Sequence, residues 1–366
     1  MQTASITPRR PLPGHVEVEA HARLHLGFFD LDGSQGRCFG SLGVALDGLV
    51  TRVRVRRGAG LSSSGPCAER AAAFARRALE HLGQNEDLAI EVLQALPEHV
   101  GLGSGTQLAL ATGAALARLH GLDWPAGDMA TVLVRGQRSG IGIGTFEQGG
   151  FVVDGGRDRD SNHPPKVISR LACPQNWRWV LVFDDQHRGL SGTAEKQAFA
   201  SLPPFPQADA AQLCRTVLTQ LLPALVDGDI GRFGQALTLL QDRVGDHFAP
   251  AQGGRYASAR VASVLAQWRE SGAAAVGQTS WGPTGFALVE SPAQARAMAA
   301  AAAAAQTHGP APLRFVICAT RNAGAGYTEF QATKRTDNAV RGVESPAAHA
   351  RTTARTSPEH EDAFHG

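Results

Sequence analysis

The sequence predicts an α+β protein built from two consecutive domains. Strand patterns come first, in the alternating stretches "HVEVEAHARLHLGFF" and "GVALDGLVTRVRVRR", and segments with apolar residues three or four positions apart follow them. Because strands and helices do not alternate regularly, a repeated βαβ arrangement is not expected. The 366 residues, of which 43% are apolar, suffice to bury one large or two ordinary cores.

The first domain is predicted over residues 1–165. After the two strand stretches, "CAERAAAFARRALEHLG" has helical spacing and ends on Gly83, and "LAIEVLQAL" returns to a strand. A glycine-rich turn then runs into an apolar helix in "LPEHVGLGSGTQLALATGAALARL", residues 96–119. A further helix is predicted in "PAGDMATVLVRG". The polar, proline-bearing "RDRDSNHPPKV" is the expected connection to the second domain.

The second domain is predicted over residues 166–330. It opens with a strand in "WRWVLVFDD", and helix patterns follow near 193–200, 209–226, 229–245 and 257–270. Two strands around a turn are expected in "AAAVGQTSWGPTGFALVE", then a helix in "SPAQARAMAAAAAAAQ" and a last strand in "LRFVICAT". Residues 331–366 are polar and poor in large apolar side chains, which predicts a disordered tail.

Composition narrows the classes of partner. A formal net charge of +2 and an aromatic fraction of 6% give no basis for binding nucleic acid or a membrane, so small-molecule partners are expected. The five cysteines are widely spaced without a C-x-x-C pair, which is typical of reduced thiols in a cytoplasmic protein. No apolar run has the length of a signal-peptide core or a membrane span, so neither export nor insertion is expected.

The glycine-rich turn is the strongest chemical signal. Gly101, Gly103 and Gly105 alternate with Ser104 and Thr106 where a helix begins. A helix start has unpaired backbone N–H groups and the positive end of the dipole, and glycines let a phosphate approach them closely. The Ser104 hydroxyl is also the candidate protein ligand for a magnesium ion that arrives with the phosphate. The alternative is an ordinary capped helix after a tight turn.

Three motifs in order resemble those of the GHMP kinase superfamily of small-molecule kinases. "PEHVGLGSGTQLALA" is similar to its P-x-x-x-G-L-G-S-S-A phosphate loop. "ARLHLGFFDLDG", residues 22–33, resembles the N-terminal substrate motif, and "GQTSWGPTGFALV", residues 277–289, the C-terminal glycine-rich motif. The resemblance implies an N-terminal ribosomal-protein-like β-α-β domain and a C-terminal ferredoxin-like α+β domain.

One departure argues against kinase chemistry. "SGIGIGTFEQGG", residues 139–150, lines up with the superfamily stretch that supplies an aspartate, but Gly142 occupies the aspartate position. Glycine cannot accept a proton, so this form of acid-base catalysis is unavailable there. The usual second serine of the phosphate loop is likewise replaced, by Gly105.

The departures resemble a narrower group, the β-ribofuranosylaminobenzene 5'-phosphate synthase family. The resemblance rests on "ARLHLGFFDLDG", "RSGIGIGTFEQGGFVVDGG" and "RGLSGTAE", residues 188–195. It implies that 5-phosphoribosyl pyrophosphate is joined to 4-aminobenzoate, with loss of carbon dioxide and pyrophosphate, in tetrahydromethanopterin biosynthesis. It also implies Mg²⁺ with the pyrophosphate, no organic cofactor and a homodimer. The choice between 4-aminobenzoate and 4-hydroxybenzoate stays open.

Inside these motifs, candidate catalytic residues are Arg23, His25 and Glu147. Arg23 and His25 alternate on one strand face, so both are expected to point into one cleft, and Glu147 is the first candidate to orient the amine or act as a base. The small residues around Gly142 are expected to let the backbone lie against a flat ring. Predicted substrate contacts are Gly101, Gly103, Ser104, Gly105, Thr106, Arg138, Ser139, Gln148, Arg188, Ser191, Thr279 and Ser280.

Two other functions remain alternatives. One is an ATP-dependent small-molecule kinase whose base comes from elsewhere, for instance Glu147 or Asp154. The other is a non-catalytic sensor of a phosphorylated ligand on the same fold. Release of labelled carbon dioxide from a carboxyl-labelled acceptor would support only the synthase, whereas ATP consumption with a sugar or polyol would support the kinase.

Overall fold

Two long antiparallel strands, β1 (Pro13–Asp30) and β3 (Gly40–Arg57), form the centre of a seven-stranded sheet. The computed structural model describes residues 12–187, 189, 197–198, 200–280, 282–305 and 311–331, and all of them belong to one unit of mutually contacting residues. Along the sheet, β13 (Gly326–Gln331) pairs with β1, while β5 (Leu88–Gln94) and then β4 (Ser62–Ser64) follow β3. The other half of β3 pairs with β6 (Phe151–Asp154), and β8 (Val167–Leu171) pairs with β6.

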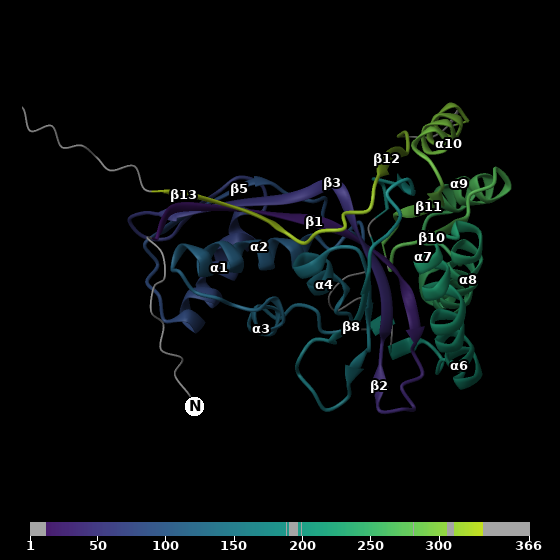
Figure 1. Ribbon diagram of the computed structural model, residues 1–366, viewed down its shortest axis with the longest axis horizontal. Helices are drawn as coiled ribbons and strands as arrows, with labels where there is room; N and C mark the ends of the chain where they lie inside the picture. The colour runs from purple at the N-terminus through teal and green to yellow at the C-terminus, as the bar shows by residue number, and fades with distance from the viewer. Residues whose placement is uncertain are drawn as a thin grey trace, which may run out of the picture. The chain divides into compact units, whose positions relative to one another are not determined.

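Four helices cover one face of this sheet: α1 (Ala68–Leu82), α2 (Ser104–Leu119), α3 (Ala126–Val132) and α4 (Ile141–Gln148) (Figure 1). In the first half of β1, alternate residues such as Val16 and Val18 are buried in the core formed with α1 and α2. Glu17 on the opposite face pairs with Arg54 of β3. The period of two thus separates a core face from a charged face, as the sequence pattern predicts.

A second, four-stranded antiparallel sheet has the order β10 (Ala275–Gln278), β11 (Gly285–Val289), β9 (Arg178–Phe183) and β12 (Arg314–Cys318). Residues of α9 (Ala259–Glu270) and α10 (Pro292–Ala304) share a core with one face. The other face packs with α6 (Gln207–Thr216), the π-helical turn Val217–Leu221, α7 (Leu222–Asp227) and α8 (Ile230–Gln252). A short pair, β2 (Arg37–Cys38) and β7 (Arg157–Asp158), completes the described strands.

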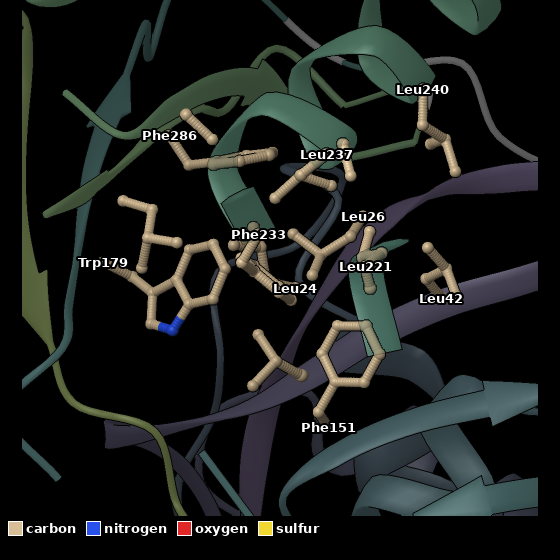
Figure 2. Packing of buried hydrophobic residues seen from close by; sticks show 14 of the residues in the cluster. Leu24, Leu26, Leu42, Phe151, Trp179, Leu221, Phe233, Leu237, Leu240 and Phe286 are labelled. Atoms are coloured by element: carbon tan, nitrogen blue, oxygen red, sulfur yellow. The ribbon is translucent and has the colours of Figure 1, made fainter. Parts of the chain in front are cut away.

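The core beneath the second sheet also contains the second half of β1. Leu24 and Leu26 lie among α8 side chains such as Phe233 and Leu237, with Trp179 of β9 nearby (Figure 2). Gln241 of α8 adds a polar link, because its Nε2 donates to the Leu26 carbonyl and its Oε1 accepts from the Gln278 N–H at 2.9 Å. The segment that follows Ala22 is therefore fixed both by packing against α8 and by the hydrogen bond from Gln241. These contacts position the part of β1 that carries Arg23 and His25.

The α+β prediction is confirmed, and so are the strands and helices expected in 275–304. Two expectations about domain organisation differ from the structure. The strand β12 is not the last, since β13 follows it and returns to pair with β1. The proline-bearing stretch 157–167 does not lead directly into the second sheet, because β8 after it pairs with β6 of the first sheet.

Some predicted segments fall outside the described residues. Most of the helix expected near 193–200 does so, and so does the expected tail apart from Gln331, which ends β13. Among the helices that the structure describes, none combines the length and the hydropathy needed to cross a bilayer.

The run around Gly142 differs from its expected role. It forms the first turns of α4, and Ile141, Gly142, Ile143 and Gly144 are all buried there. A methyl group on Gly144 would lie 2.6 Å from Val167 Cγ2 and 2.7 Å from Val152 Cγ1. The small residues therefore allow close packing of α4 on β6 and β8, and they do not form a surface for a ligand ring.

Candidate active site

The candidate site is centred on the first turn of α2. Gly103 precedes this helix with a φ of 81°, a left-handed conformation that glycine adopts without strain. Its carbonyl accepts hydrogen bonds from the N–H groups of Thr106 and Gln107, both at 3.0 Å. Within the described part of the chain, the N–H groups of Ser104 and Gly105 have no hydrogen-bond acceptor. Free N–H donors and the positive end of a helix dipole are the features that bind anions at helix starts, so this turn is the candidate anion site.

The turn before α2 is tied to the loop that follows β10. The Thr279 hydroxyl donates to the Gly101 carbonyl at 2.8 Å and accepts from the His25 backbone N–H at 3.1 Å. A methyl group on Gly101 would lie 2.8 Å from the Thr279 carbonyl oxygen, so only glycine fits there. Thr279, a predicted substrate contact, is fully buried in these contacts. Its position corrects that prediction: Thr279 holds the turn in place.

Arg23 and His25 of β1 both line one cavity of about 540 Å³ beside the start of α2. The pairing of β1 with β3 is irregular between His21 and Arg23 and again between His25 and Gly27, and such bulges re-aim side chains near functional sites. Arg23 donates from Nη1 to the Gly101 carbonyl, which links the strand to the glycine-rich turn. The described lining residues are Arg23, His25, Phe28, Phe39, Thr106, Val134, Arg135, Gly136, Gln137, Arg138, Ser139, Arg157 and Ser280.

Both arginine and aromatic side chains line the cavity. Four of its described lining residues are arginines and none is Asp or Glu, which favours an anionic ligand. Phe28 is 4.7 Å from His25 and 5.8 Å from Phe39, measured between ring centroids. An aromatic wall of this kind suits a flat ring.

The chemistry of His25 follows from its hydrogen bonds. Its Nδ1 accepts from the Gly27 N–H at 3.2 Å, which assigns the proton of the neutral ring to Nε2. The side chain is 1% exposed, and Nε2 is buried without a partner among the described residues. Burial, and then the nearby charge of Arg23, hold the His25 pKa well below its usual value. His25 is therefore a neutral ring whose Nε2–H can donate a hydrogen bond, and this protonation state disfavours His25 as a proton acceptor through Nε2.

Ser139 is held at the cavity by Asp154, which lies behind it. The Asp154 carboxylate accepts from the Ser139 hydroxyl at 3.2 Å, the Gly140 N–H at 2.8 Å and the Gly156 N–H at 2.9 Å, and also from the Ser41 hydroxyl. Burial raises the pKa of Asp154 to about 6 although these donors oppose the shift. Asp154 is fully buried, so it positions the start of α4 and is not available as the base of a kinase reaction.

This buried carboxyl predicts a pH-dependent contribution to stability. Because the folded-state pKa is raised above the unfolded value of 3.8 to about 6, its contribution is fully present below pH 4 and is lost as the pH rises through 6. Urea unfolding of the wild type and of Asp154→Asn, which cannot titrate, isolates the effect. The wild-type free energy of unfolding minus that of the variant should fall by about 2–3 kcal/mol between pH 4 and pH 7. A difference that stays constant over this range would contradict the assignment.

The position of Gly142 shows where an aspartate at this place in the motif would lie. A methyl group on it would lie 3.1 Å from Thr106 Cγ2 and 3.8 Å from Gln107 Nε2. An acidic side chain at Gly142 would therefore face the first turn of α2, where a phosphate would bind. With glycine there, Gln107 instead donates from Nε2 to the Gly142 carbonyl at 2.9 Å.

Glu147 and Gln148 lie elsewhere, at the far end of α4. They line a neighbouring hollow with residues of α3 and the 157–167 stretch; this hollow shares Arg157 with the arginine-rich cavity, but neither Glu147 nor Gln148 lines that cavity. The helix explains this, because seven residues at 1.5 Å each place Glu147 roughly 10 Å along the axis from Gly140. The structure therefore does not support Glu147 as a catalytic group or Gln148 as a contact in this cavity.

Other predicted contacts divide between the cavity and undescribed residues. Thr106, Arg138, Ser139 and Ser280 line the cavity. Arg188 and Ser191 lie outside the described residues. Sequence reasoning missed the lining residues Phe28, Phe39, Arg135 and Arg157. A weak signal for one of them existed, since Arg135 and Arg138 flank a glycine just before the "SGIGIG" motif.

The residues present do not make a metal site by themselves. No cluster of three or more His, Cys, Asp or Glu that could hold an ion occurs among the described residues, and the described cavity lining offers no carboxylate. Mg²⁺ prefers carboxylate and phosphate oxygens. A magnesium ion here would depend on ligand phosphates, with the Ser104 hydroxyl as the candidate protein ligand.

The fold has clear parallels among known proteins. The family described as GHMP kinases N terminal domain matches residues 68–150, and GHMP kinases C terminal matches residues 221–307. Homoserine kinase from Cytophaga hutchinsonii has a TM-score of 0.62 at 19% identity and covers 89% of this chain and 100% of its own. Mevalonate diphosphate decarboxylase from Staphylococcus aureus has 0.60 at 15% identity, with 86% and 98% covered. The chain therefore has the GHMP kinase fold.

A curated relative is more specific: beta-ribofuranosylphenol 5'-phosphate synthase of Methanothermobacter thermautotrophicus is 31% identical over 330 residues, 84% of this chain and 97% of the relative. The chain belongs to the beta-ribofuranosylphenol 5'-phosphate synthase family. The relative of the same name from Archaeoglobus fulgidus is 32% identical over 289 residues, 75% of this chain and 88% of that protein. The resemblance seen in the motifs is thus confirmed at the level of the family, which is a family of enzymes.

Proposed function

We propose that this protein joins 5-phosphoribosyl 1-pyrophosphate to a para-substituted benzoate through a carbon–carbon bond, with release of carbon dioxide and pyrophosphate. The chemical properties of the cavity lining suit both substrates. Its arginines and the free N–H groups of Ser104 and Gly105 favour phosphate groups. The wall formed by Phe28 and Phe39 favours a benzoate ring.

The observation that carries the proposal is a cavity with four arginines and no acidic residue among its described lining residues. The ring carbon that bears the carboxylate attacks the anomeric carbon, and the bond to pyrophosphate breaks with its electron pair on oxygen. The bond to carbon dioxide then breaks, and its electrons restore the aromatic ring. No proton leaves the ring, so this reaction needs no carboxylate base, whereas transfer of phosphate to a hydroxyl requires that a proton be accepted.

Different groups of residues would contribute different interactions to the reaction. Backbone donors at the start of α2 and the arginines would stabilise the charge that develops on the departing pyrophosphate. Arg23 also holds the glycine-rich turn through the Gly101 carbonyl. The His25 Nε2–H would donate to an oxygen of the substrate, because nothing in the described protein accepts it. The aromatic wall would exclude water from the reacting carbon.

The acceptor is a choice between two benzoates. The word phenol in the names of the relatives points to 4-hydroxybenzoate, and the aminobenzene resemblance of the motifs points to 4-aminobenzoate. We place 4-hydroxybenzoate first, since these relatives cover most of the chain. A magnesium ion carried by the pyrophosphate, a homodimer, a cytoplasmic location and a place in tetrahydromethanopterin biosynthesis remain parts of the proposal.

The test is a product assay with the purified chain. It is incubated with 5-phosphoribosyl pyrophosphate, magnesium chloride and each benzoate labelled in the carboxyl group, and labelled carbon dioxide and pyrophosphate are counted. Equal amounts of the two products are expected, with the higher kcat/KM for 4-hydroxybenzoate. ATP consumption with sugars or polyols, without labelled carbon dioxide, would overturn the proposal in favour of a kinase. Phosphate-ligand binding without any turnover would favour a sensor.

A further inference from the structure

The flank of α2 at Gly105 carries a pair of arginines that the mechanism above does not assign. A methyl group on Gly105 would lie 2.8 Å from Arg70 Nη2 and 3.1 Å from Arg135 Nη1. Arg70 comes from the first turn of α1, and Arg135 comes from the loop between α3 and α4. Two guanidinium groups from distant segments therefore converge on the same helical turn that offers free backbone N–H groups.

The positive charge of Arg135 is less well compensated than that of Arg70. Arg70 forms an ion pair with Glu98, but Arg135 Nε is buried without a hydrogen-bond partner among the described residues. Burial lowers the pKa of Arg135, and the positive charges of Arg70 and Arg77 lower it further. A partly buried cation that faces other cations, with no carboxylate acting on it in the described chain, lacks a counter-ion that a ligand would supply.

The backbone is strained where it presents Arg135. Val134 has a φ of 54°, a left-handed conformation that is unfavourable for a β-branched residue. The Arg135 N–H donates to the Ala130 carbonyl at 2.7 Å, which closes the end of α3. Both Val134 and Arg135 line the 540 Å³ cavity, so the strained turn brings the guanidinium to the cavity wall.

The opposite flank of the same turn carries Arg23. A methyl group on Gly103 would lie 2.9 Å from Arg23 Cγ, whereas one on Gly105 meets Arg70 and Arg135. An anion at the free N–H groups of Ser104 and Gly105 would thus have arginine on both sides. Arg23 shares its side with His25, next to the aromatic wall where the anomeric carbon would react.

We propose that Arg135, assisted by Arg70, forms a subsite for the terminal phosphate of the pyrophosphate group, at the side of α2 remote from the aromatic wall. The inference rests on the proposed function, and it specifies which part of 5-phosphoribosyl pyrophosphate these residues bind. The 5-phosphate of the ribose lies elsewhere in the cavity. Arg135 is a binding residue here, since it contacts the leaving group and not the reacting carbon.

Calorimetric titration of the full-length chain with inorganic pyrophosphate and with ribose 5-phosphate tests this assignment. Arg135→Ala should weaken pyrophosphate binding by about tenfold or more, because a charge-assisted hydrogen bond is lost, and should change ribose 5-phosphate binding by less than about twofold. Arg76→Ala removes an exposed arginine of α1 and should change neither. Equal weakening of both ligands, or of ribose 5-phosphate alone, would overturn the assignment.

A second variant tests the subsite independently, in case Arg135→Ala does not fold. Gly105→Ala retains every charge, improves helix propensity and pushes a methyl group against both guanidinium groups. It should raise the Tm slightly and still weaken pyrophosphate binding several-fold. Gly127→Ala is the matched control, because Gly127 lies in the first turn of α3 with no atom within 4 Å of the added methyl. Unchanged pyrophosphate affinity in Gly105→Ala would count against the subsite.

Measuring pyrophosphate binding and turnover side by side distinguishes a failure of the subsite from a failure of the proposed reaction. Pyrophosphate binding does not depend on turnover, so a wild-type chain that binds pyrophosphate through Arg135 but releases no labelled carbon dioxide contradicts the proposed reaction alone. A wild-type chain that turns over and whose pyrophosphate affinity does not respond to Arg135→Ala contradicts the subsite alone.

Discussion

Gly103→Ala is expected to lower kcat/KM for 5-phosphoribosyl pyrophosphate by about a hundredfold or more, because it displaces two parts of the anion site together. The residue has a φ of 81°, and the left-handed conformation costs a non-glycine residue roughly 1–2 kcal/mol. The added methyl would also lie 2.9 Å from Arg23 Cγ and 3.3 Å from Arg23 Nε. Steady-state kinetics and calorimetric titration with pyrophosphate measure the two effects.

The control for this prediction is Gly83→Ala. Gly83 ends α1 with a φ of 63°, and an added methyl there meets no atom within 4 Å. It therefore imposes a comparable backbone strain away from the cavity, and it should lower the Tm without changing kcat/KM. If Gly103→Ala retained wild-type kinetics, or if both variants lost activity in proportion to their stability, the anion site at α2 would be wrong.

His25→Asn is expected to fold like the wild type and to lose about a hundredfold in kcat. The asparagine Oδ1 can replace Nδ1 as acceptor for the Gly27 N–H, which keeps the local fold. The side chain is too short to replace the Nε2–H donor, which is buried without a partner in the described chain. Circular dichroism checks the fold, and single-turnover kinetics check the chemical step.

The pH dependence of the rate shows whether His25 acts as a hydrogen-bond donor or as a general base. Because burial and Arg23 hold the pKa of His25 well below 6.5, the imidazole is neutral at pH 6.5 and above. The wild-type rate should therefore show no limb from His25 near pH 6.5, and His25→Asn should lower the rate equally across pH 6.5–8. His25→Gln, which loses the Gly27 contact but can extend an amide N–H, should recover part of kcat. A limb near pH 6.5 that disappears in His25→Asn would show that His25 titrates during catalysis.

Local sequence pattern predicted much of the fold because local chemistry determines it. Alternation in the first half of β1, the apolar spacing of α2 and the glycine at the end of α1 each predict an element where the structure has one. β13 was missed because Gly326–Gln331 is short and largely exposed, so only pairing with β1 makes it a strand. The role of β8 was likewise decided by its pairing with β6.

One physical reason explains which predicted site residues lie at the cavity and which do not. Arg23, His25 and Thr106 belong to motifs whose local geometry already faces the cavity. Glu147 lies away from the cavity because α4 carries it to the far end of a helix, into another hollow. The sequence order of "SGIGIGTFEQGG" places Glu147 close to Gly142 in number, but a helix converts that separation into distance along an axis.

By itself, the sequence predicted an anion site at the glycine-rich helix start and showed that Gly142 provides no acid, since both inferences rest on single residues and their neighbours. Only the tertiary structure decided which distant side chains share that anion site. Arg70 and Arg135 lie 65 positions apart, and they meet at Gly105 because α1, α2 and the loop after α3 pack on one sheet face. Periodicity reports which face of a helix is buried, but it carries no information about which element lies opposite.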